Sequence, residues 1–552
     1  MISAVPKFSE TTFDVIVIGA GINGAGIARD AAMRGLKVLL LDKGDAGGGT
    51  SSWSTRLIHG GLRYLEYGEI GLVRESLRER ETLLHIAPHL VRALPLLVPI
   101  YKDARRGPWT MRAGMILYDV LSFDKTLPRH RMLSRAETLE KLPALKPEGL
   151  LGAAVYYDAQ VEFAERLVLE NALSALACGA TVLTYASVDK LIVEDGKVSG
   201  VEFTHHQPDN RLTAREGAYQ ERHTAVATVV FNAAGPWVDQ LLEKASANSP
   251  QLIGGTKGSH LVVAPFTGAP GCAIYVEAES DHRPFFIIPW NSNYLIGTTD
   301  IRYDGDLDHV RIEAEEIKYL LRETNRIFPA ANLGQDDILY TYAGIRPLPF
   351  AGDKEEKSIT RRHFIRRHLQ AGNLFSIVGG KLTTYRSLAE EAVDLVFNEL
   401  GKKVPECSTN QVPLPGAVTP ETTSEFSVFH RNFNQSSGFP QEISDRLLRI
   451  YGTRAAEIMK LAAGDLSLAE VFDVETQAIA AEVVYAFEHE RADTLVDCLF
   501  RRTMVGLNST CGLNAVQRAA TIAQNYLGWS KERVSKEVAG YRKYVERFRL
   551  NP

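Results

Sequence analysis

Three glycines near the amino terminus have the spacing of a turn that binds nucleotide phosphates. Gly19, Gly21 and Gly24 form the pattern Gly-x-Gly-x-x-Gly. The first glycine allows a tight turn, the second lets the backbone approach a pyrophosphate, and the third lets a helix pack closely on a strand. N–H groups at the start of such a helix bind phosphate oxygens, and Asn23 lies at that start. We therefore predict a nucleotide site at residues 19–24.

The flanking sequence supplies the elements that this turn requires. Residues 13–19 (FDVIVIG) predict a buried strand, residues 22–34 an alanine-rich helix, and residues 37–41 (KVLLL) a second buried strand. Asp42 ends the second strand, where its carboxylate would bind the adenosine ribose, and we expect Lys43 to contact the nucleotide as well. The pattern alone does not distinguish FAD from NAD, and a glycine-rich turn that binds nothing is the alternative.

A second strand that ends in glycine favours FAD. The apolar run ATVVFN leads into Ala233, Ala234 and Gly235, an arrangement that suits contact with FAD from the far side. An ordinary turn glycine is the alternative. Flavin enzymes that also use NAD(P)H often carry a second Gly-x-Gly-x-x-Gly, and the sequence contains none. We expect Ala234, Gly235 and Val188 to contact FAD.

Histidine, arginine and hydroxyl side chains gather in residues 47–64. His59, Arg63 and Tyr64 lie among glycines and small hydroxyl residues, where the backbone is bare enough for a ring system to approach. The apolar residues between them indicate partial burial, and a buried histidine or arginine needs partners. An ordinary polar surface loop is the alternative. The hydroxyl residues that we expect at the cofactor are Thr50, Ser51, Ser52 and Ser54.

Two later turns each carry one cation. Arg346 lies in a neutral turn between glycine and proline, and Lys381 follows two glycines after the apolar run LFSIV. The helix that opens at Lys381 and runs to about residue 400 would direct its amino terminus at negative charge on a reduced flavin. Simple capping by Thr383 or Thr384 is an alternative that is compatible with this role. The expected cofactor contacts here are Gly380, Lys381, Leu382 and Thr383.

Composition excludes several classes of protein. The 552 residues hold 62 Lys and Arg against 67 Asp and Glu, a balance that argues against a dedicated nucleic-acid binder. Length and 45% hydrophobic content indicate a soluble globular chain of several domains. The five cysteines are scattered without a Cys-x-x-Cys pair, which supports neither a zinc ribbon nor disulfides and favours a reducing compartment. No apolar run reaches the roughly 20 residues of a membrane span.

The motifs, taken together, are those of one family. They are GAGINGAGIARDAAMRG, TSSWSTRLIHGGLRYLEYGEIGLVRESLRER, FNAAGPWVDQL, KGSHLVV, FIIPW, IGTTD, YAGIRPL, VGGKLTTYR and ADTLVDCLFRRT. In this order they cover nearly the whole chain, which therefore resembles the FAD-dependent, quinone-linked glycerol-3-phosphate dehydrogenases of the aerobic type. Two features depart from the family: Asp42 stands where glutamate is common, and residues 204–222, expected as a surface hairpin or loop, match no family pattern.

The resemblance implies an α/β fold with an α+β substrate part. A Rossmann-like FAD-binding domain of the glycine/D-amino-acid oxidase type would carry an antiparallel substrate sheet and an all-helical C-terminal domain. FAD-binding segments at about 12–90, 150–250 and 350–400 would alternate with substrate-binding segments at about 90–150 and 250–350. A proline-, serine- and threonine-rich linker would follow at 401–430, and the helical domain at 431–552.

The resemblance also implies a reaction, the oxidation of sn-glycerol 3-phosphate to dihydroxyacetone phosphate. A hydride would pass to FAD, and the electrons would go on to a membrane quinone. Arginines suit the phosphate, and Arg346 and Arg63 are the candidates. His59 or His260 would accept the hydroxyl proton, and the sequence does not rank them. Lys381 would steady negative charge, and the remaining polar contacts would come from Tyr64 and Thr299.

A quinone acceptor implies contact with a membrane. Residues 99–123 combine Lys102, Arg105, Arg106, Trp109 and Arg112 with an apolar stretch, as in a segment that lies on anionic lipid. The clusters at 361–363 and 366–368 are also basic. A solvated charged face is the alternative for each. We expect a peripheral or monotopic protein on the cytoplasmic face of the inner membrane, with a homodimer among its expected assemblies.

Three other functions compete with the dehydrogenase. An oxidase would pass electrons to oxygen and make hydrogen peroxide, but family oxidases tend to carry an insertion that is absent here. A protein that only binds FAD would be expected to lose some of Arg63, Arg346 and Lys381, and all are present. An amine-oxidising relative would bind a carboxylate and an uncharged amine, and arginines suited to phosphate weigh against it.

Overall fold

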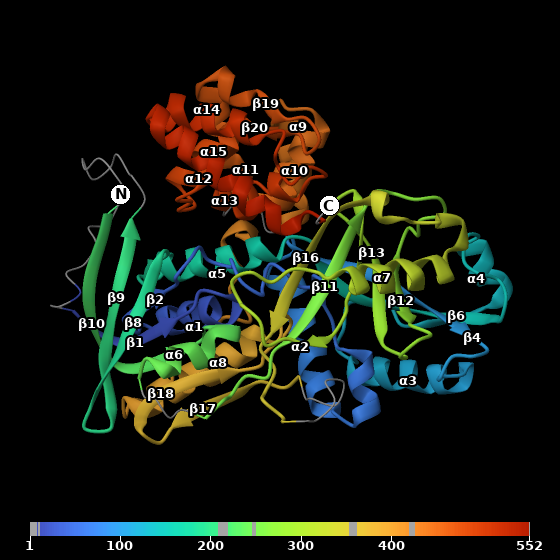
Figure 1. The fold of residues 1–552 in the computed structure, drawn as a ribbon, viewed down its shortest axis with the longest axis horizontal. Helices are drawn as coiled ribbons and strands as arrows, with labels where there is room; N and C mark the ends of the chain where they lie inside the picture. The colour runs from blue at the N-terminus through green and yellow to red at the C-terminus, as the bar shows by residue number, and fades with distance from the viewer. Residues whose placement is uncertain are drawn as a thin grey trace.

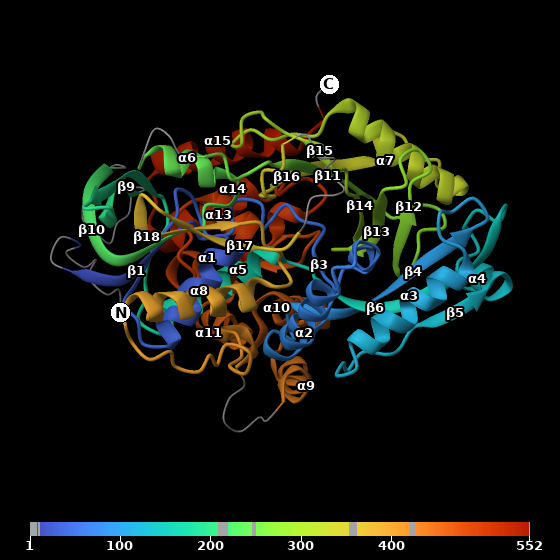
Figure 2. The ribbon, with the colours of Figure 1, turned by 90° about the horizontal axis from the view of Figure 1, so that it is seen from below.

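A computed structural model describes residue 8 and residues 11–207, 219–245, 250–352, 361–418 and 425–550. Two large sheets lie side by side along the longest axis, and the helical C-terminal part lies on one side of them (Figures 1 and 2). Among the described residues, no helix is both long and apolar enough to cross a membrane.

In the first sheet, parallel strands flank β1, the strand that leads into the glycine-rich turn. β1 is parallel to β2 on one side and to β10 on the other, β2 is parallel to β7, and β10 to β18. The strands in sheet order are β17 (Phe364–His368), β18 (Ala371–Val378), β10 (Tyr219–Asn232), β1 (Thr12–Ile18), β2 (Val38–Leu41) and β7 (Thr181–Leu183). The βαβ unit expected at residues 13–41 is confirmed.

Both faces of β1 are buried, as its unbroken apolar sequence predicts. Val15 and Val17 pack against the helices α1 (Ile22–Met33), α5 (Ala164–Ala177) and α8 (Tyr385–Glu399). Ile16 and Ile18 face the opposite layer, which is formed by β8 (Ala186–Glu194), β9 (Lys197–Gln207) and α6 (Val238–Glu243). A parallel strand covered on two sides needs apolar residues at every position. The tip of the expected hairpin between β9 and β10 lies outside the described residues.

The second sheet is antiparallel except where β4 meets β12. Its ten strands are β3 (Leu57–Ile58), β4 (Val91–Tyr101), β5 (Arg131–Ser134), β6 (Leu150–Val161), β11 (Thr256–Val263), β12 (Ala273–Glu277), β13 (Pro284–Trp290), β14 (Asn293–Gly297), β15 (Ile301–Arg302) and β16 (Ile338–Arg346). β6 pairs with β4 along its length. The chain therefore leaves this sheet near residue 161, later than the boundary expected near residue 150.

Helices cover both faces of the second sheet. α7 (Ala314–Ile327) packs on one face with β11 and β14. On the other face lie α2 (Ile70–Ile86) and α3 (Pro108–Leu121), while α4 (Arg135–Lys141) lies beside β5 and β6. Tyr118 of α3 and Arg80 of α2 meet on the buried carboxylate of Asp158 in β6. These contacts fix the loop of residues 47–64 between the two sheets.

The C-terminal part is helical apart from a ribbon of two short strands, β19 (Val471–Asp473) and β20 (Ala478–Ile479). Its helices are α9 (Phe426–Ser436), α10 (Gln441–Tyr451), α11 (Ala455–Gly464), α12 (Ala480–Glu488), α13 (Leu495–Asp497), α14 (Val516–Leu527) and α15 (Lys531–Val545). They form one group above α5 in Figure 1. We call residues 425–550 the helical domain; its first helix begins five residues before the boundary expected at 431.

The segment expected to be a linker is only partly one. Residues 401–418 pack on α1 and α2. The Cys407 thiol is buried beside Asp30 of α1, and the Leu414 N–H donates to the carbonyl of Ile86 at the end of α2. Proline and hydroxyl residues predicted an exposed connection, but composition does not show that Cys407 and Leu414 fill positions in the core. Residues 419–424 lie outside the described part of the chain.

Candidate active site

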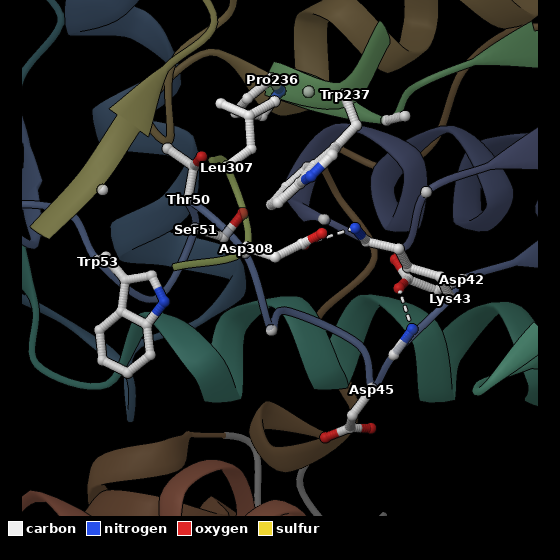
Figure 3. A pocket seen from close by; sticks show the side chains of 18 of the residues that line it. Asp42, Lys43, Asp45, Thr50, Ser51, Trp53, Pro236, Trp237, Leu307 and Asp308 are labelled. Carbon is white, nitrogen blue, oxygen red and sulfur yellow. Dashed lines mark hydrogen bonds and ion pairs between the residues drawn. The ribbon is translucent and has the colours of Figure 1, made fainter. Parts of the chain in front are cut away.

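A cavity of about 830 Å³ lies where the first sheet, the second sheet and the helical domain meet. Figure 3 shows its side near Asp42, Ser51 and Trp237. The turn after β1, the end of β16 and the turn after β18 all line it. The cavity therefore borders both the predicted nucleotide turn and the predicted catalytic lysine.

The glycine turn is closed so tightly that side chains are excluded. Gly19 has a φ of 105°, and a Cβ there would lie 2.5 Å from the Ala233 carbonyl oxygen. A Cβ on Gly24 would lie 1.8 Å from the Gly19 carbonyl oxygen. At Gly21 the nearest atom to a Cβ would be Ser51 Oγ at 3.5 Å, so this glycine leaves the backbone open towards the cavity. Ser51 Oγ accepts a hydrogen bond of 3.0 Å from the Ile22 N–H and so caps α1.

Asp42 is held at the cavity by its own neighbours. Its carboxylate accepts hydrogen bonds from the Ala20 N–H at 2.5 Å and the Gly44 N–H at 2.8 Å. Burial raises the pKa of Asp42 to about 6, although these N–H groups oppose the shift. Beside it, Lys43 Nζ lies 4.3 Å from the centre of the Trp237 ring and 2.6 Å from Asp308 Oδ1 (Figure 3). The carboxylate thus stays oriented for hydroxyl donors.

Three polar atoms in the cavity wall are buried and have no hydrogen-bond partner among the described residues. They are Asn23 Oδ1, Trp237 Nε1 and Lys381 Nζ. An unpaired buried polar group is costly, so each of these atoms is suited to bind a ligand. Gly380 makes room for Asn23, because a Cβ at that glycine would lie only 2.7 Å from Asn23 Nδ2.

Charged side chains converge near Lys381. Its Nζ lies 3.9 Å from the centre of the Tyr64 ring. Burial lowers the pKa of Lys381 to about 7, against the raising effect of Glu69 and Glu75. Lys381 therefore carries a proton that it can release near neutral pH.

Two arginines share one carboxylate beside this lysine. Arg346 Nη1 lies 3.0 Å from Asp300 Oδ1, and Arg361 Nη2 lies 2.9 Å from Asp300 Oδ2. Burial raises the pKa of Asp300, but the two guanidinium groups outweigh it and hold this pKa at about 2. The group of two cations and one anion carries a net positive charge. Arg346 and Arg361 also lie close enough to Tyr64 to influence its pKa, which burial raises.

Two glycines of the second sheet make room for the site. A Cβ on Gly258 would lie 2.3 Å from Arg346 Nη2, and a Cβ on Gly297 would lie 2.4 Å from His260 Cδ2. Gly258 is in β11 and Gly297 ends β14, opposite His260 in the strand register. The absence of a side chain lets a guanidinium group and an imidazole lie flat across the sheet.

Both predicted histidines are uncharged at neutral pH. His260 stacks on Tyr342 at 4.8 Å between ring centres, and its Nε2 lies 2.9 Å from Thr55 Oγ1. Burial, with Arg346 and Arg56 nearby, holds the pKa of His260 well below its usual value. Burial also lowers the pKa of His59, although Asp158 opposes the shift. A neutral imidazole can accept a proton.

Comparisons with known proteins match this geometry. A family model described as FAD dependent oxidoreductase matches residues 14–386, and one described as the C-terminal domain of alpha-glycerophosphate oxidase matches residues 407–534. A glycerol-3-phosphate dehydrogenase of Synechocystis sp. is 46% identical over 551 residues, which cover 98% of each chain. The chain belongs to the FAD-dependent glycerol-3-phosphate dehydrogenase family.

Further members of the family support the assignment. An aerobic glycerol-3-phosphate dehydrogenase of Bacillus subtilis is 34% identical over 501 residues, 90% of this chain and 87% of the relative. The solved structure of the glycerol-3-phosphate dehydrogenase from Bacillus halodurans, complexed with FAD, is 31% identical. It covers 98% of this chain and 96% of its own, with a TM-score of 0.76. The predicted family and fold class are confirmed.

The cofactor of this family is FAD, as predicted. The cavity fits a dinucleotide through its glycine turn, its oriented Asp42 and its unpartnered Asn23 and Trp237. Most of the expected cofactor contacts line it: Gly19, Gly21, Asn23, Asp42, Lys43, Thr50, Ser51, Ser54, Val188, Ala234, Gly235, Gly380, Lys381 and Leu382.

Three expected cofactor contacts support the cavity from behind. Gly24 packs under the turn. Ser52 is buried and its hydroxyl donates to the Gly47 carbonyl at 2.5 Å. The Thr383 hydroxyl accepts a hydrogen bond of 3.2 Å from the His59 N–H. The hydroxyls of Ser52 and Thr383 are already used within the protein, so these two side chains fix the loop and the turn that carry the contacts.

Two expected substrate contacts are placed differently. The Thr299 hydroxyl donates to Glu316 at 2.6 Å and accepts from the Ser259 N–H, and it is the Thr299 carbonyl that accepts from Arg346, at 3.2 Å. The hydroxyl that reaches Arg346 belongs to Thr298, at 2.9 Å. Arg63 lies beside Tyr67, to whose hydroxyl it donates at 3.2 Å. Arg346, Lys381 and Tyr64 do come together as expected.

Arg361 is the site residue that sequence reasoning missed. The sequence placed it in a basic surface cluster, but it pairs with Asp300, 61 residues away in the chain. His363 of the same cluster is buried and paired with Glu391 at 2.9 Å. No local pattern marks Arg361, since the carboxylate that recruits it lies on the second sheet.

The space above Gly258 gives a testable prediction. We expect Gly258→Ala to push Arg346 away from Thr298 and to lower the free energy of unfolding by about 1–3 kcal/mol, because the added methyl overpacks the sheet. A crystal structure and denaturant unfolding of the variant would measure both effects. Gly271→Ala is the control, since a Cβ there meets no atom within 4 Å. An unchanged Arg346 with wild-type stability contradicts the prediction.

Proposed function

We propose that this protein oxidises sn-glycerol 3-phosphate to dihydroxyacetone phosphate and passes the electrons to a membrane quinone. The observation that carries the proposal is the pair of Arg346 and Arg361 on the single carboxylate of Asp300, with Lys381, which lines the FAD cavity, within electrostatic reach of Arg361. A substrate with a phosphate dianion supplies the negative charge that this cluster lacks. The named activity of the relatives in Synechocystis and Bacillus subtilis supports the same substrate.

Arg346 and Arg361 would bind the phosphate. A guanidinium group offers two parallel N–H donors that match two phosphate oxygens. Asp300 fixes the orientation of both groups, and Arg346 Nη2 also donates to the Thr298 hydroxyl and the Thr299 carbonyl. The donors offered to a ligand are the N–H groups that these contacts do not use. Preformed orientation reduces the entropy lost on binding.

His260 would accept the proton of the substrate hydroxyl. Donation from His260 Nε2–H to Thr55 leaves Nδ1 as a lone-pair acceptor, and Nδ1 is buried without a partner among the described residues. Its low pKa keeps it neutral and able to accept. The His59 ring lies edge-on to Phe286, with ring centres 6.4 Å apart, and would border the site as a second neutral imidazole. Bound FAD supplies the acceptor for the hydride that leaves the substrate.

Lys381 would hold negative charge that develops on the substrate oxygen. The Tyr64 ring below its Nζ leaves the ammonium N–H groups free to donate. A cation in a site from which water is excluded stabilises such charge more than it would in water. A pKa near 7 also allows Lys381 to take up or release a proton during turnover.

Arg346 gives a prediction on substrate choice. We expect Arg346→Ala to lower kcat/KM for sn-glycerol 3-phosphate about 100-fold, because charge-assisted hydrogen bonds to the phosphate are lost. Turnover of unphosphorylated glycerol should change less than about threefold. Exposed Arg366 provides the control variant, Arg366→Ala, which should match the wild type for both substrates. Equal losses for the two substrates would argue against a phosphate role.

Lys381 gives a prediction on pH. Because its pKa is lowered to about 7, Lys381 loses its charge above that pH, and we expect kcat for sn-glycerol 3-phosphate to fall several-fold between pH 7 and 9, since the charge that Lys381 stabilises develops during the reaction. Lys381→Met should have a low kcat that stays flat over this range. Steady-state kinetics from pH 6 to 9 measure both, with exposed Lys318→Met as the control that keeps the wild-type profile. A kcat that still falls with pH in Lys381→Met would exclude Lys381 as the titrating group.

The contact with a membrane would be made through α3. Trp109 is 80% exposed and Phe123, just beyond the helix, 78% exposed, with Val120 at 60% between them. The basic side chains of Lys102, Arg105 and Arg112 are exposed on the same segment. Apolar rings beside cations are the pattern of a segment that lies in a lipid headgroup layer. This surface supports attachment to anionic lipid, and with it access to a quinone.

Vesicle binding tests the α3 surface. We expect the double variant Trp109→Ala with Phe123→Ser to bind about tenfold less to vesicles of phosphatidylglycerol and phosphatidylcholine, since two large apolar side chains leave the lipid. Co-sedimentation with the vesicles measures the loss. Leu369→Ser removes a 96% exposed leucine elsewhere on the surface and should bind normally. Equal binding by all three proteins would remove α3 as the contact.

The overall function is tested without oxygen. Purified holoprotein is mixed with sn-glycerol 3-phosphate, the flavin spectrum is followed, and then either a soluble quinone or air is admitted. Bleaching by substrate with fast recovery by quinone and slow recovery in air supports the dehydrogenase. Fast recovery in air would instead indicate an oxidase. Absence of bleaching in flavin-loaded protein would refute the substrate and direct the search to amines.

A further inference from the structure

The helical domain forms one wall of the FAD cavity. Seven cavity residues come from α15 and the short turn that follows it: Lys536, Glu537, Gly540, Tyr541, Tyr544, Arg547 and Phe548. These residues lie beyond residue 534, where the second matched family model ends, and far outside the FAD-dependent oxidoreductase model. The second model does cover Thr494, Val496 and Arg501, which also line the cavity, but neither model covers the cavity residues of α15.

We propose that α15 closes the FAD cavity, so that the helical domain governs how fast FAD leaves the protein. The proposal rests on FAD as the cofactor and is independent of which substrate is oxidised. It assigns α15 to retention of the dinucleotide, in addition to the glycine turn and Asp42.

The carboxyl end of α15 is fastened to both of the other parts of the cavity wall. The Phe548 ring packs on Trp53 with centres 5.0 Å apart, and Trp53 lies in the loop that also carries Thr50 and Ser51. Arg547 Nη2 donates to the Asp308 carbonyl at 3.5 Å, and Asp308 holds Lys43 through its side chain. These contacts join α15 to the segments around the cofactor.

A buried group of ion pairs near Asp42 also holds the helical domain on the first sheet. Asp45 Oδ2 lies 2.6 Å from Arg501 Nε and 2.6 Å from Arg502 Nη1, and all three side chains are buried. Nearby, the Tyr185 hydroxyl donates to Asp497 at 2.7 Å. Breaking a buried pair leaves unpaired charge and is strongly unfavourable. The helical domain therefore stays docked on the loop that would hold the adenosine ribose.

The charge of α15 suits the ligand. Lys536 is exposed at the cavity edge, and Arg547 stacks on Tyr544 at 4.4 Å, so this wall carries two cations against one carboxylate, that of Glu537, which accepts a hydrogen bond from the Leu495 N–H. FAD carries two negative charges on its diphosphate, and positive potential along the exit slows the departure of an anion. Release of FAD then requires α15 to move away from Trp53 and Asp308.

Gly540 allows a sharp test, because a Cβ at this helical position would meet no atom within 4 Å. Gly540→Ala adds a methyl group and favours the helix, whereas Gly540→Trp projects a large ring into the cavity. The holoproteins are diluted, and release of FAD is followed by the rise in its fluorescence. We expect release at least tenfold faster from Gly540→Trp and within twofold of the wild type from Gly540→Ala. Wild-type release from Gly540→Trp overturns the proposal.

A pair of charge-reversal variants tests whether α15 controls FAD release even if Gly540→Trp fails to fold. Lys536 and Lys531 are both exposed on α15, but only Lys536 lines the cavity. We expect Lys536→Glu to release FAD at least threefold faster than Lys531→Glu, with the difference shrinking at high salt. Equal release from the two variants also overturns the proposal. Neither readout depends on turnover, so failure here is distinct from failure of the proposed reaction.

Discussion

The close contact between the turn after β1 and the end of β10 sets the geometry of the whole molecule. Gly19 lies against the Ala233 carbonyl so tightly that no side chain fits between them. This contact brings the start of α1, the end of β2 and the turn after β10 to one point, and all three border the same cavity. The second sheet and the helical domain are then placed around that point.

Burial of charge gives the site its chemistry. Asp300 is held ionised by Arg346 and Arg361, while Lys381 loses part of its preference for the proton because its ammonium is buried. His260 is kept neutral by the same removal of water. Buried charges are unfavourable unless they are paired, and a cluster with one cation in excess is completed by an anionic ligand. The electrostatic imbalance of the free protein thus suits an anionic ligand.

Sequence alone predicts the features that depend on neighbouring residues. The glycine turn, the strand before it and Asp42 all lie within one βαβ unit, so their spacing in the sequence is enough to predict them. Arg361 is not predicted because Asp300, its partner, is distant in the chain, and the sequence does not show that the Thr298 hydroxyl is the one that reaches Arg346. The residues 401–418 were misread for the same reason: burial is a property of the fold.

The proposed membrane surface on α3 and the helical domain lie on different sides of the protein. In Figure 1 α3 is at the lower edge of the molecule, and the helical domain is at the upper edge. A molecule resting on lipid through α3 has its helical domain in the water. Loading and loss of the flavin, which require α15 to lift, then take place on the aqueous side. Such an enzyme can exchange its cofactor while it remains at the bilayer, with no need to detach first.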